Sequence, residues 1–154
     1  MKRSELKIVL SFKYPKRLRF VCERCAICCG DTEERNRSVL LLQIEAQRIS
    51  KKILKQVGDF AEKVGGSEPY VYRIKKNGDG RCVFLRDNSC SIYEMRPLIC
   101  KFYPFQLTSS ENDKLVFDYT SECPSIGKGP ELGISFFKKL YEESLRLMQE
   151  DAVK

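Results

Sequence analysis

The sequence predicts a small α+β domain with short strands or hairpins, two main helices and an irregular cysteine-rich metal-binding core. Its length of 154 residues suits a single domain with a hydrophobic core of its own. Hydrophobic periodicity alternates along the chain between the two-residue repeat of strands and the three-to-four-residue repeat of helices. Eight cysteines, more than such a core needs, lie between these segments. We therefore expect residues 1–154 to form one cysteine-cluster domain.

Four segments with alternating apolar and polar residues are expected to be strands. They are residues 6–12, 18–20, 70–74 and 115–119. The first two flank a break at 14–16 and are expected to pair as a hairpin. Turn-forming residues at 77–80 and 86–89 enclose the short apolar run Cys82–Leu85, so the chain should reverse on both sides of it.

Two longer segments have helical periodicity. Apolar residues three or four apart mark a helix over residues 42–64, and the Gly65-Gly66-Ser67 sequence should end it. A second helix is expected over about residues 131–152, where apolar side chains recur at the same spacing. Between 91 and 105, Pro97 and Pro104 allow at most one short helix followed by irregular chain.

The absence of histidine removes several classes of function. Without imidazole there is no Cys–His nucleophile pair, no Ser-His-Asp triad and no His-liganded zinc. No pair of carboxylates stands out as acid and base, and Asn77–Gly80 is too short for a phosphate loop. We assign no catalytic residue, and the sequence favours a binding protein over an enzyme.

The expected location is the cytoplasm. Residues 1–7 are charged and the apolar run behind them, 8–10, is far shorter than a secretory signal or a membrane span. Thiols stay reduced in that compartment, so metal ligation is preferred over four disulfides. Thiolates bound to metal would lower the net charge of +7 to roughly +3, so nucleic acid is not an expected partner. The expected partners are a metal ion or cluster and another protein.

The sharpest motif is Cys22-x2-Cys25-x2-Cys28-Cys29. Cysteines two residues apart can direct both sulfurs to one point, and a third at the same spacing is typical of bacterial ferredoxin loops rather than of paired zinc ligands. If the backbone is extended at Cys28 and Cys29, their side chains point in opposite directions and can serve different sites. Eight ligands suffice for two four-coordinate sites, or for one cluster with supporting thiols. The candidate metal ligands are Cys22, Cys25, Cys28, Cys29, Cys82, Cys90, Cys100 and Cys123.

The ordered motifs of residues 18–125 give the sequence a recognisable family. After the first motif come Gly80-x-Cys82-x-Phe84-Leu85 and Cys90-x-Ile92-Tyr93-x2-Arg96-Pro97-x2-Cys100-x-Phe102-x-Pro104, followed by Cys123. This set resembles the CxxCxxCC cysteine-cluster family, to which zinc or iron chelation is attributed. Family members often carry Gly where this chain has Ala26 or Ile27, and Arg where it has Lys101. Neither difference removes a candidate ligand.

The leading hypothesis is a cysteine-ligated metal-binding protein that holds an iron–sulfur cluster, with the 4Fe–4S type favoured. Its role would be electron transfer, metal handling or support of a partner enzyme. Arg96, between Cys90 and Cys100, is the candidate cofactor-binding residue, because its guanidinium can offset thiolate charge or donate to sulfur. It could equally pair with Glu94 or cap a short helix.

Two alternatives stay open. One is a zinc-stabilised interaction module. The other is a metal-dependent methyl- or sulfur-transfer enzyme, since flagellin lysine methylases look similar around their cysteines, although this chain has no methyl-donor glycine motif that we can identify.

Overall fold

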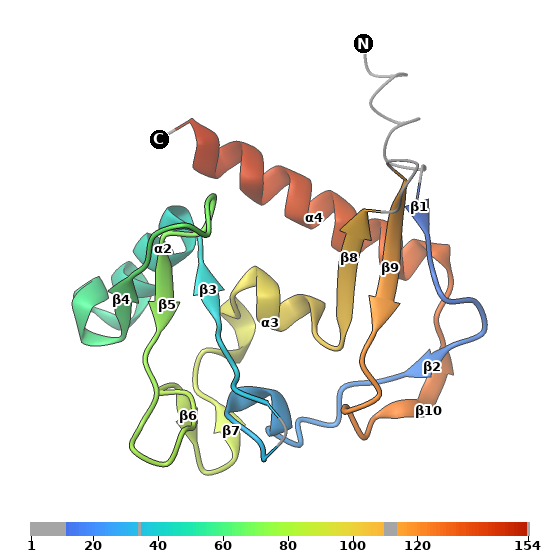
Figure 1. The fold of residues 1–154 in the computed structure, drawn as a ribbon, viewed down its shortest axis with the longest axis horizontal. Coiled ribbons are helices and arrows are strands. Elements are labelled where there is room, and N and C mark those ends of the chain that lie inside the picture. Colours follow the sequence, from blue (N-terminus) through green and yellow to red (C-terminus); the bar gives the residue numbers. More distant parts are fainter. Residues whose placement is uncertain (1–11, 34, 110–113, 154) are drawn as a thin grey trace. The chain divides into compact units, whose positions relative to one another are not determined.

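The computed structural model describes residues 12–33, 35–109 and 114–153, and most of the expected strand 6–12 lies outside them. The chain divides into two compact units (Figure 1). Unit 1 comprises Met1–Glu23 and Phe102–Leu147, and unit 2 comprises Arg24–Lys101 and Met148–Lys154. Short strands in small sheets, together with two main helices, confirm the expected α+β class. That the two units form one domain stays a prediction.

Unit 1 is built on a sheet of order β1-β9-β8 and a separate pair, β10-β2. The bounds are β1 Phe12–Lys13, β2 Arg19–Phe20, β8 Phe105–Ser109, β9 Leu115–Tyr119 and β10 Ile126–Glu131. Strands β8 and β9 are antiparallel, with Phe105 opposite Tyr119. The strand expected at 115–119 is therefore confirmed with its bounds.

The hairpin expected between the first two strands is wrong for the part of it that the structure describes. Strand β1 runs parallel to β9, and β2 pairs antiparallel with β10, so each has its partner far away in sequence. The sequence of strand β10 does not alternate between apolar and polar residues, so the pattern did not predict it. It can approach β2 because residue 129 is glycine: its φ is +79°, and a Cβ there would lie 2.6 Å from a methyl of Val21.

An aromatic core holds unit 1 together. Helix α4, Ile134–Ala152, confirms the C-terminal helix to within three residues of its expected start. Its Phe137 is fully buried, with ring centroids 5.1 Å from those of Phe105 and Phe117. Each such buried ring contributes about 2–3 kcal/mol through removal of apolar surface from water. The apolar residues that recur along α4 form the face of the helix that covers this sheet.

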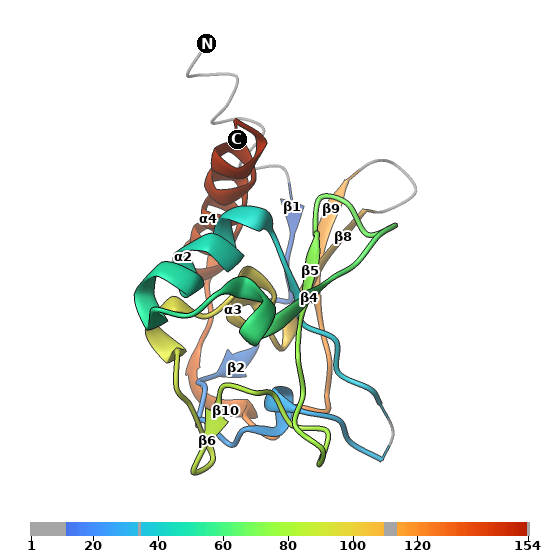
Figure 2. The same ribbon diagram turned by 90° about the vertical axis from the view of Figure 1, so that its left-hand side faces the viewer.

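Unit 2 contains the three-stranded sheet β3-β5-β4 and the hairpin β6–β7. Its strands are β3 Leu40–Leu41, β4 Ala61–Lys63, β5 Tyr72–Ile74, β6 Leu85–Arg86 and β7 Ser89–Cys90. Its helices are α2 Gln43–Ile53 and α3 Leu98–Phe102, the latter ending one residue into unit 1, with short 3-10 turns η1 Ile27–Cys29, η2 Val57–Asp59 and η3 Tyr93–Met95. Figure 2 shows α2 beside β4 and β5, in agreement with one shared hydrophobic core.

The helix predicted over 42–64 is correct only as far as Ile53. Leu54 adopts a left-handed conformation with φ 59°, and its amide donates to the carbonyl of Ser50, which ends the helix. The chain then forms η2 and β4, where Ala61 pairs with Ile74 of β5. Apolar spacing continued past Ile53 because buried residues of a turn and a strand happened to repeat it, and strand pairing prevailed over the local pattern.

A buried carboxylate joins the helices of unit 2. Glu45 accepts hydrogen bonds from the amides of Leu42, at 3.0 Å, and Leu98, at 2.5 Å, so it caps α2 and anchors the start of α3. Burial raises the pKa of Glu45. Asp151, in the last turn of α4, accepts from the amide of Ile44 at 2.9 Å. Among the described residues, no helix combines the length and apolar character required to cross a membrane.

Candidate metal centre

The first cysteine motif is a tight turn rather than an extended segment. Ala26, with φ 68°, introduces η1, which contains Cys28 and Cys29. The Cys29 thiol donates a hydrogen bond to the sulfur of Cys28, which lowers the pKa of Cys28 and raises that of Cys29. Opposite directions for these two side chains depended on an extended backbone, which the structure does not have here, because Ile27–Cys29 forms a 3-10 turn.

Backbone pairing attaches this turn to the second cysteine segment. The amide of Cys82 donates to the carbonyl of Cys29 at 2.6 Å, and the amide of Asp31 donates to the carbonyl of Gly80 at 3.0 Å. Gly30 lies between them, opposite Arg81. A Cβ on Gly30 would be 3.0 Å from the Arg81 Cα, so any other residue would force the two segments apart by a few tenths of an ångström.

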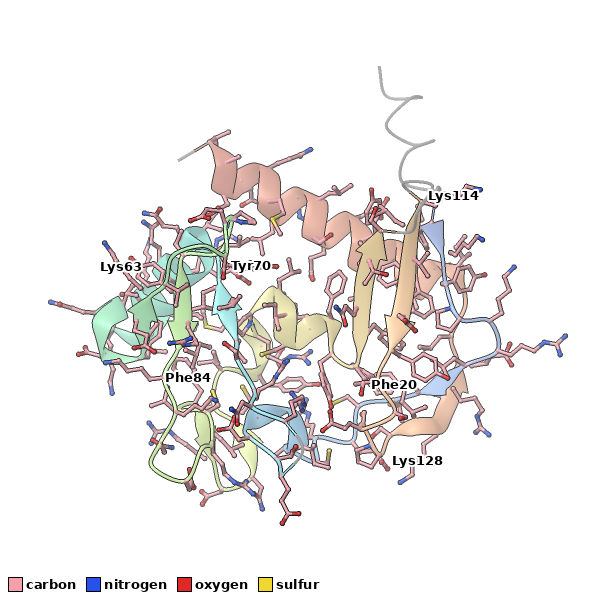
Figure 3. All side chains as sticks on the ribbon, viewed as in Figure 1. Phe20, Lys63, Tyr70, Phe84, Lys114 and Lys128 are labelled. Carbon is pink, nitrogen blue, oxygen red and sulfur yellow. The ribbon has the colours of Figure 1, made fainter. Side chains whose placement is uncertain are left out.

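A hairpin then carries Cys90 back toward Cys82. Asp87 and Asn88 both have positive φ, 52° and 59°, as a two-residue turn between antiparallel strands requires. The turn expected at 86–89 is therefore confirmed. Phe84, labelled in Figure 3, is buried against Phe60 with ring centroids 5.4 Å apart, and it anchors the segment that leads into the hairpin.

An arginine–tyrosine stack holds the first motif to the third cysteine segment. The guanidinium carbons of Arg24 and Arg96 lie 3.8 Å and 3.9 Å from the centroid of the Tyr93 ring. One face of a phenol ring is too small for two stacked guanidinium groups, so they hold it from opposite sides. Arg96 Nε also donates to the Tyr93 carbonyl at 3.1 Å. Helix α3, which carries Cys100, begins two residues later.

The thiols of these segments lie in a partly apolar environment. Cys82, Cys90 and Cys100 pack against the core of unit 2. Burial raises the pKa of all three thiols, that of Cys100 to about 12. Each is raised further by the charge of neighbouring thiolates, Cys28 among them. Removing protons from such a group requires positive charge beside it, and a bound metal supplies this charge.

The loop after the first motif brings an arginine that the sequence pattern did not identify. Arg37 Nε donates to the carbonyl of Cys28 at 3.0 Å, and its amide donates to Asp31 Oδ1 at 2.6 Å. The same carboxylate oxygen forms an ion pair with Lys76 at 2.6 Å. Hydrogen bonds from Lys76 and from the Arg37 amide lower the pKa of Asp31. No spacing signal relates residue 37 to the cysteines, because the loop geometry alone brings it there.

Five of the eight predicted ligands lie together in unit 2. Cys29 and Cys100 are each within electrostatic reach of Cys28, Cys82 and Cys90. Cys25 is exposed in the same unit. The other two cysteines belong to unit 1: Cys22 is exposed and Cys123 is buried. Residues next to them are linked by a hydrogen bond of 3.0 Å that Ser125 Oγ donates to Glu23 Oε1.

The donor set suits thiolate metal chemistry in kind and in number. Over the described ranges, however, no three Cys, Asp or Glu side chains surround a common point closely enough for a single ion. Zinc bonds to sulfur at about 2.3 Å, so four sulfurs around one zinc ion must lie nearly in contact. Side-chain rotation would be needed to bring these thiols onto one ion, while the backbone already holds their segments together.

The fold and the site define a small α+β protein with a cluster of cysteines. The chain belongs to the CxxCxxCC family, described as "Putative zinc- or iron-chelating domain", whose profile matches residues 21–124. Two uncharacterized proteins of Methanocaldococcus jannaschii are similar to it: MJ0939 is 28% identical over 88% of this chain, and MJ0661 is 26% identical over 77%. The chain spans 45% of the first relative and 60% of the second. No solved structure matches it significantly.

Proposed function

We propose that this chain binds a thiolate-ligated iron–sulfur cluster through unit 2 and serves electron transfer, metal handling or a partner enzyme. One observation carries the proposal: the first cysteine motif is held to two later cysteine segments, more than 50 residues away in sequence, by the Cys82–Cys29 backbone bond and the Tyr93 stack. Linking three separate segments at their cysteines is what a shared metal centre requires. The ligands are drawn from the eight cysteines. In unit 2 the candidates are Cys25 and Cys28 of the first motif, together with Cys29, Cys82, Cys90 and Cys100.

The spacing of the first cysteines supports a cluster over a single zinc ion. The Cys22-x2-Cys25-x2-Cys28 run has the ferredoxin spacing. A polynuclear cluster takes each cysteine on a different iron, so its ligands stand farther apart than those of one tetrahedral ion.

The surroundings supply what a buried anionic centre needs. Phe84 and Ile92 are buried next to the cysteine segments and would lower the local dielectric, which is a main influence on cluster potential. Arg96 is half-buried, and its charge opposes that of the Cys28 and Cys90 thiolates. We therefore assign Arg96 to cofactor binding as a counter-charge, although its Nε is occupied by the Tyr93 carbonyl.

Anaerobic purification followed by iron, acid-labile sulfide and zinc analysis tests this proposal. We expect iron and sulfide in similar amounts and a brown protein. Cys90→Ser should lose most of the metal, whereas Ser89→Ala on the same hairpin should keep it. A colourless chain with one or two zinc ions would reject the cluster in favour of a zinc-stabilised module. Metal-dependent turnover of a methyl or sulfur donor would instead support the transferase alternative.

A further inference from the structure

We infer that Arg37 is a positioning residue of the metal centre, fixing the Cys28–Cys29 turn and offsetting the negative charge of the bound thiolates. This inference rests on the proposed function but concerns a residue outside every cysteine motif. The guanidinium belongs to the loop that follows the first motif, and it contacts the turn through main-chain atoms of Cys28.

The contacts of Arg37 show how its position is fixed. Its amide is held by Asp31 at 2.6 Å, and Asp31 is in turn held by Lys76 at 2.6 Å. Lys76 also pairs with Cys82 in an isolated bridge. Asp31 and Lys76 therefore form a brace that links the Arg37 loop to the second cysteine segment. Arg37 is thereby fixed at two points. Its backbone amide is bonded to Asp31 of the brace, and its side-chain Nε donates to the Cys28 carbonyl at 3.0 Å.

The position of the guanidinium relative to the thiols gives its charge a role. The guanidinium lies beside the first cysteine turn, with Nε 3.0 Å from the Cys28 carbonyl oxygen. The Asp31–Lys76 ion pair holds the same loop next to the residue opposite Cys82. The positive charge of Arg37 is therefore close to the first two cysteine segments. Arg37 is also half-buried, so solvent screens this interaction less than at a free surface. Arg96, stacked on the Tyr93 ring and bonded to the Tyr93 carbonyl, belongs to the third cysteine segment, so the two arginines supply positive charge from different segments.

An arginine suits both tasks. Its guanidinium stays charged at any physiological pH, and its rigid planar fork can hold a carbonyl oxygen in a fixed geometry through Nε. Lysine would keep the charge but has only a single flexible ammonium. Comparing the two residues at position 37 therefore separates positioning from charge.

The test uses the full chain purified anaerobically, with Arg37→Gln, Arg37→Lys and the control Arg73→Gln, an exposed cation paired with Glu62. We expect Arg37→Gln to shift the reduction potential to a more negative value, because the reduced centre gains negative charge without its counter-ion. Metal loss to a chelator should speed up about tenfold or more, as for other residues that orient metal ligands. Arg37→Lys should restore the potential but not the slow metal loss. The control should change neither.

A further variant guards against a purely structural effect. Asp31→Asn weakens the same brace but leaves Arg37 charged, and it removes a negative charge, so its potential should stay or move to a more positive value. If Asp31→Asn shifts the potential in the negative direction as Arg37→Gln does, or if Arg37→Gln leaves the potential and metal loss unchanged, the inference is wrong. If the unaltered chain takes up no iron, the proposed function fails first and is identified as the failure.

Discussion

Replacing Gly30 by alanine should separate the first cysteine turn from the Gly80–Cys82 segment. The added Cβ would lie 3.0 Å from the Arg81 Cα and 3.1 Å from the Gly80 carbonyl oxygen. Both neighbours are backbone atoms, which cannot rotate away as a flexible side chain would. The backbone of Gly30 is itself extended, so the effect is steric. We therefore expect the two segments to move apart.

The magnitude follows from the contacts at stake. The pairing includes the Asp31–Gly80 and Cys82–Cys29 hydrogen bonds, each contributing about 1 kcal/mol net. Overpacking in a close contact adds about 1–3 kcal/mol. Because these effects partly replace each other, we expect Gly30→Ala to lower the free energy of unfolding by about 2–4 kcal/mol, together with most of the metal content.

Urea unfolding of the reduced, metal-free chain measures this change without any contribution from bound metal. Gly58→Ala is the matched control, since no atom lies within 4 Å of the added Cβ and its φ is not positive. That control should be neutral or stabilise by up to about 1 kcal/mol. Unchanged stability and metal content in Gly30→Ala would refute the idea that this close approach assembles the site.

Three further perturbations test other parts of the account. Glu45→Gln should destabilise by about 1–3 kcal/mol at neutral pH, because an amide cannot accept both backbone hydrogen bonds. Burial raises the pKa of Glu45 above 4.5, so the folded state binds its proton more tightly than the unfolded one. The contribution of this group to the free energy of unfolding should therefore fall as pH rises through and just above 4.5. Over that range the urea midpoint of the unaltered chain should fall relative to that of Glu45→Gln, whose amide does not titrate. Tyr93→Leu removes two guanidinium–ring contacts and should lose about 1–2 kcal/mol in thermal unfolding, unlike Tyr119→Leu on a half-exposed strand position of unit 1. Ala26→Gly relieves a left-handed conformation worth about 1 kcal/mol, which the entropy of glycine offsets in part, whereas Ala26→Val should clearly destabilise; equal stability of these two variants would contradict the assigned φ of 68°.

Local periodicity predicted the elements whose pattern is set by one packed face. The strand Leu115–Tyr119 and helix α4 were both found from the sequence, because each covers an apolar core with a regular repeat. Strand β10 carries two glycines and a proline, and it exists because Gly129 allows β2 to approach. Its formation depends on a partner more than 100 residues away, which no local window contains.

The sequence likewise showed only part of the candidate site. The spacing of Cys22, Cys25 and Cys28 makes these residues candidate ligands from the sequence alone, because thiols at two-residue intervals are typical of metal-binding loops. The sequence did not show which cysteine segments lie together. Their proximity depends on backbone pairing between Cys29 and Cys82 and on the stack at Tyr93. Arg37 was missed for a related reason: its role comes from a loop brace formed by charged residues that, in sequence, resemble an ordinary polar surface.

The central claim is that cysteines from three separate segments bind the same metal centre. Alkylation of the metal-loaded chain under anaerobic conditions, followed by mass spectrometry of its peptides, tests this directly. We expect Cys28, Cys82, Cys90 and Cys100 to be protected together, and to become reactive together when the metal is removed under denaturing conditions. Protection confined to one segment, or equal labelling of all eight cysteines with and without metal, would contradict the account.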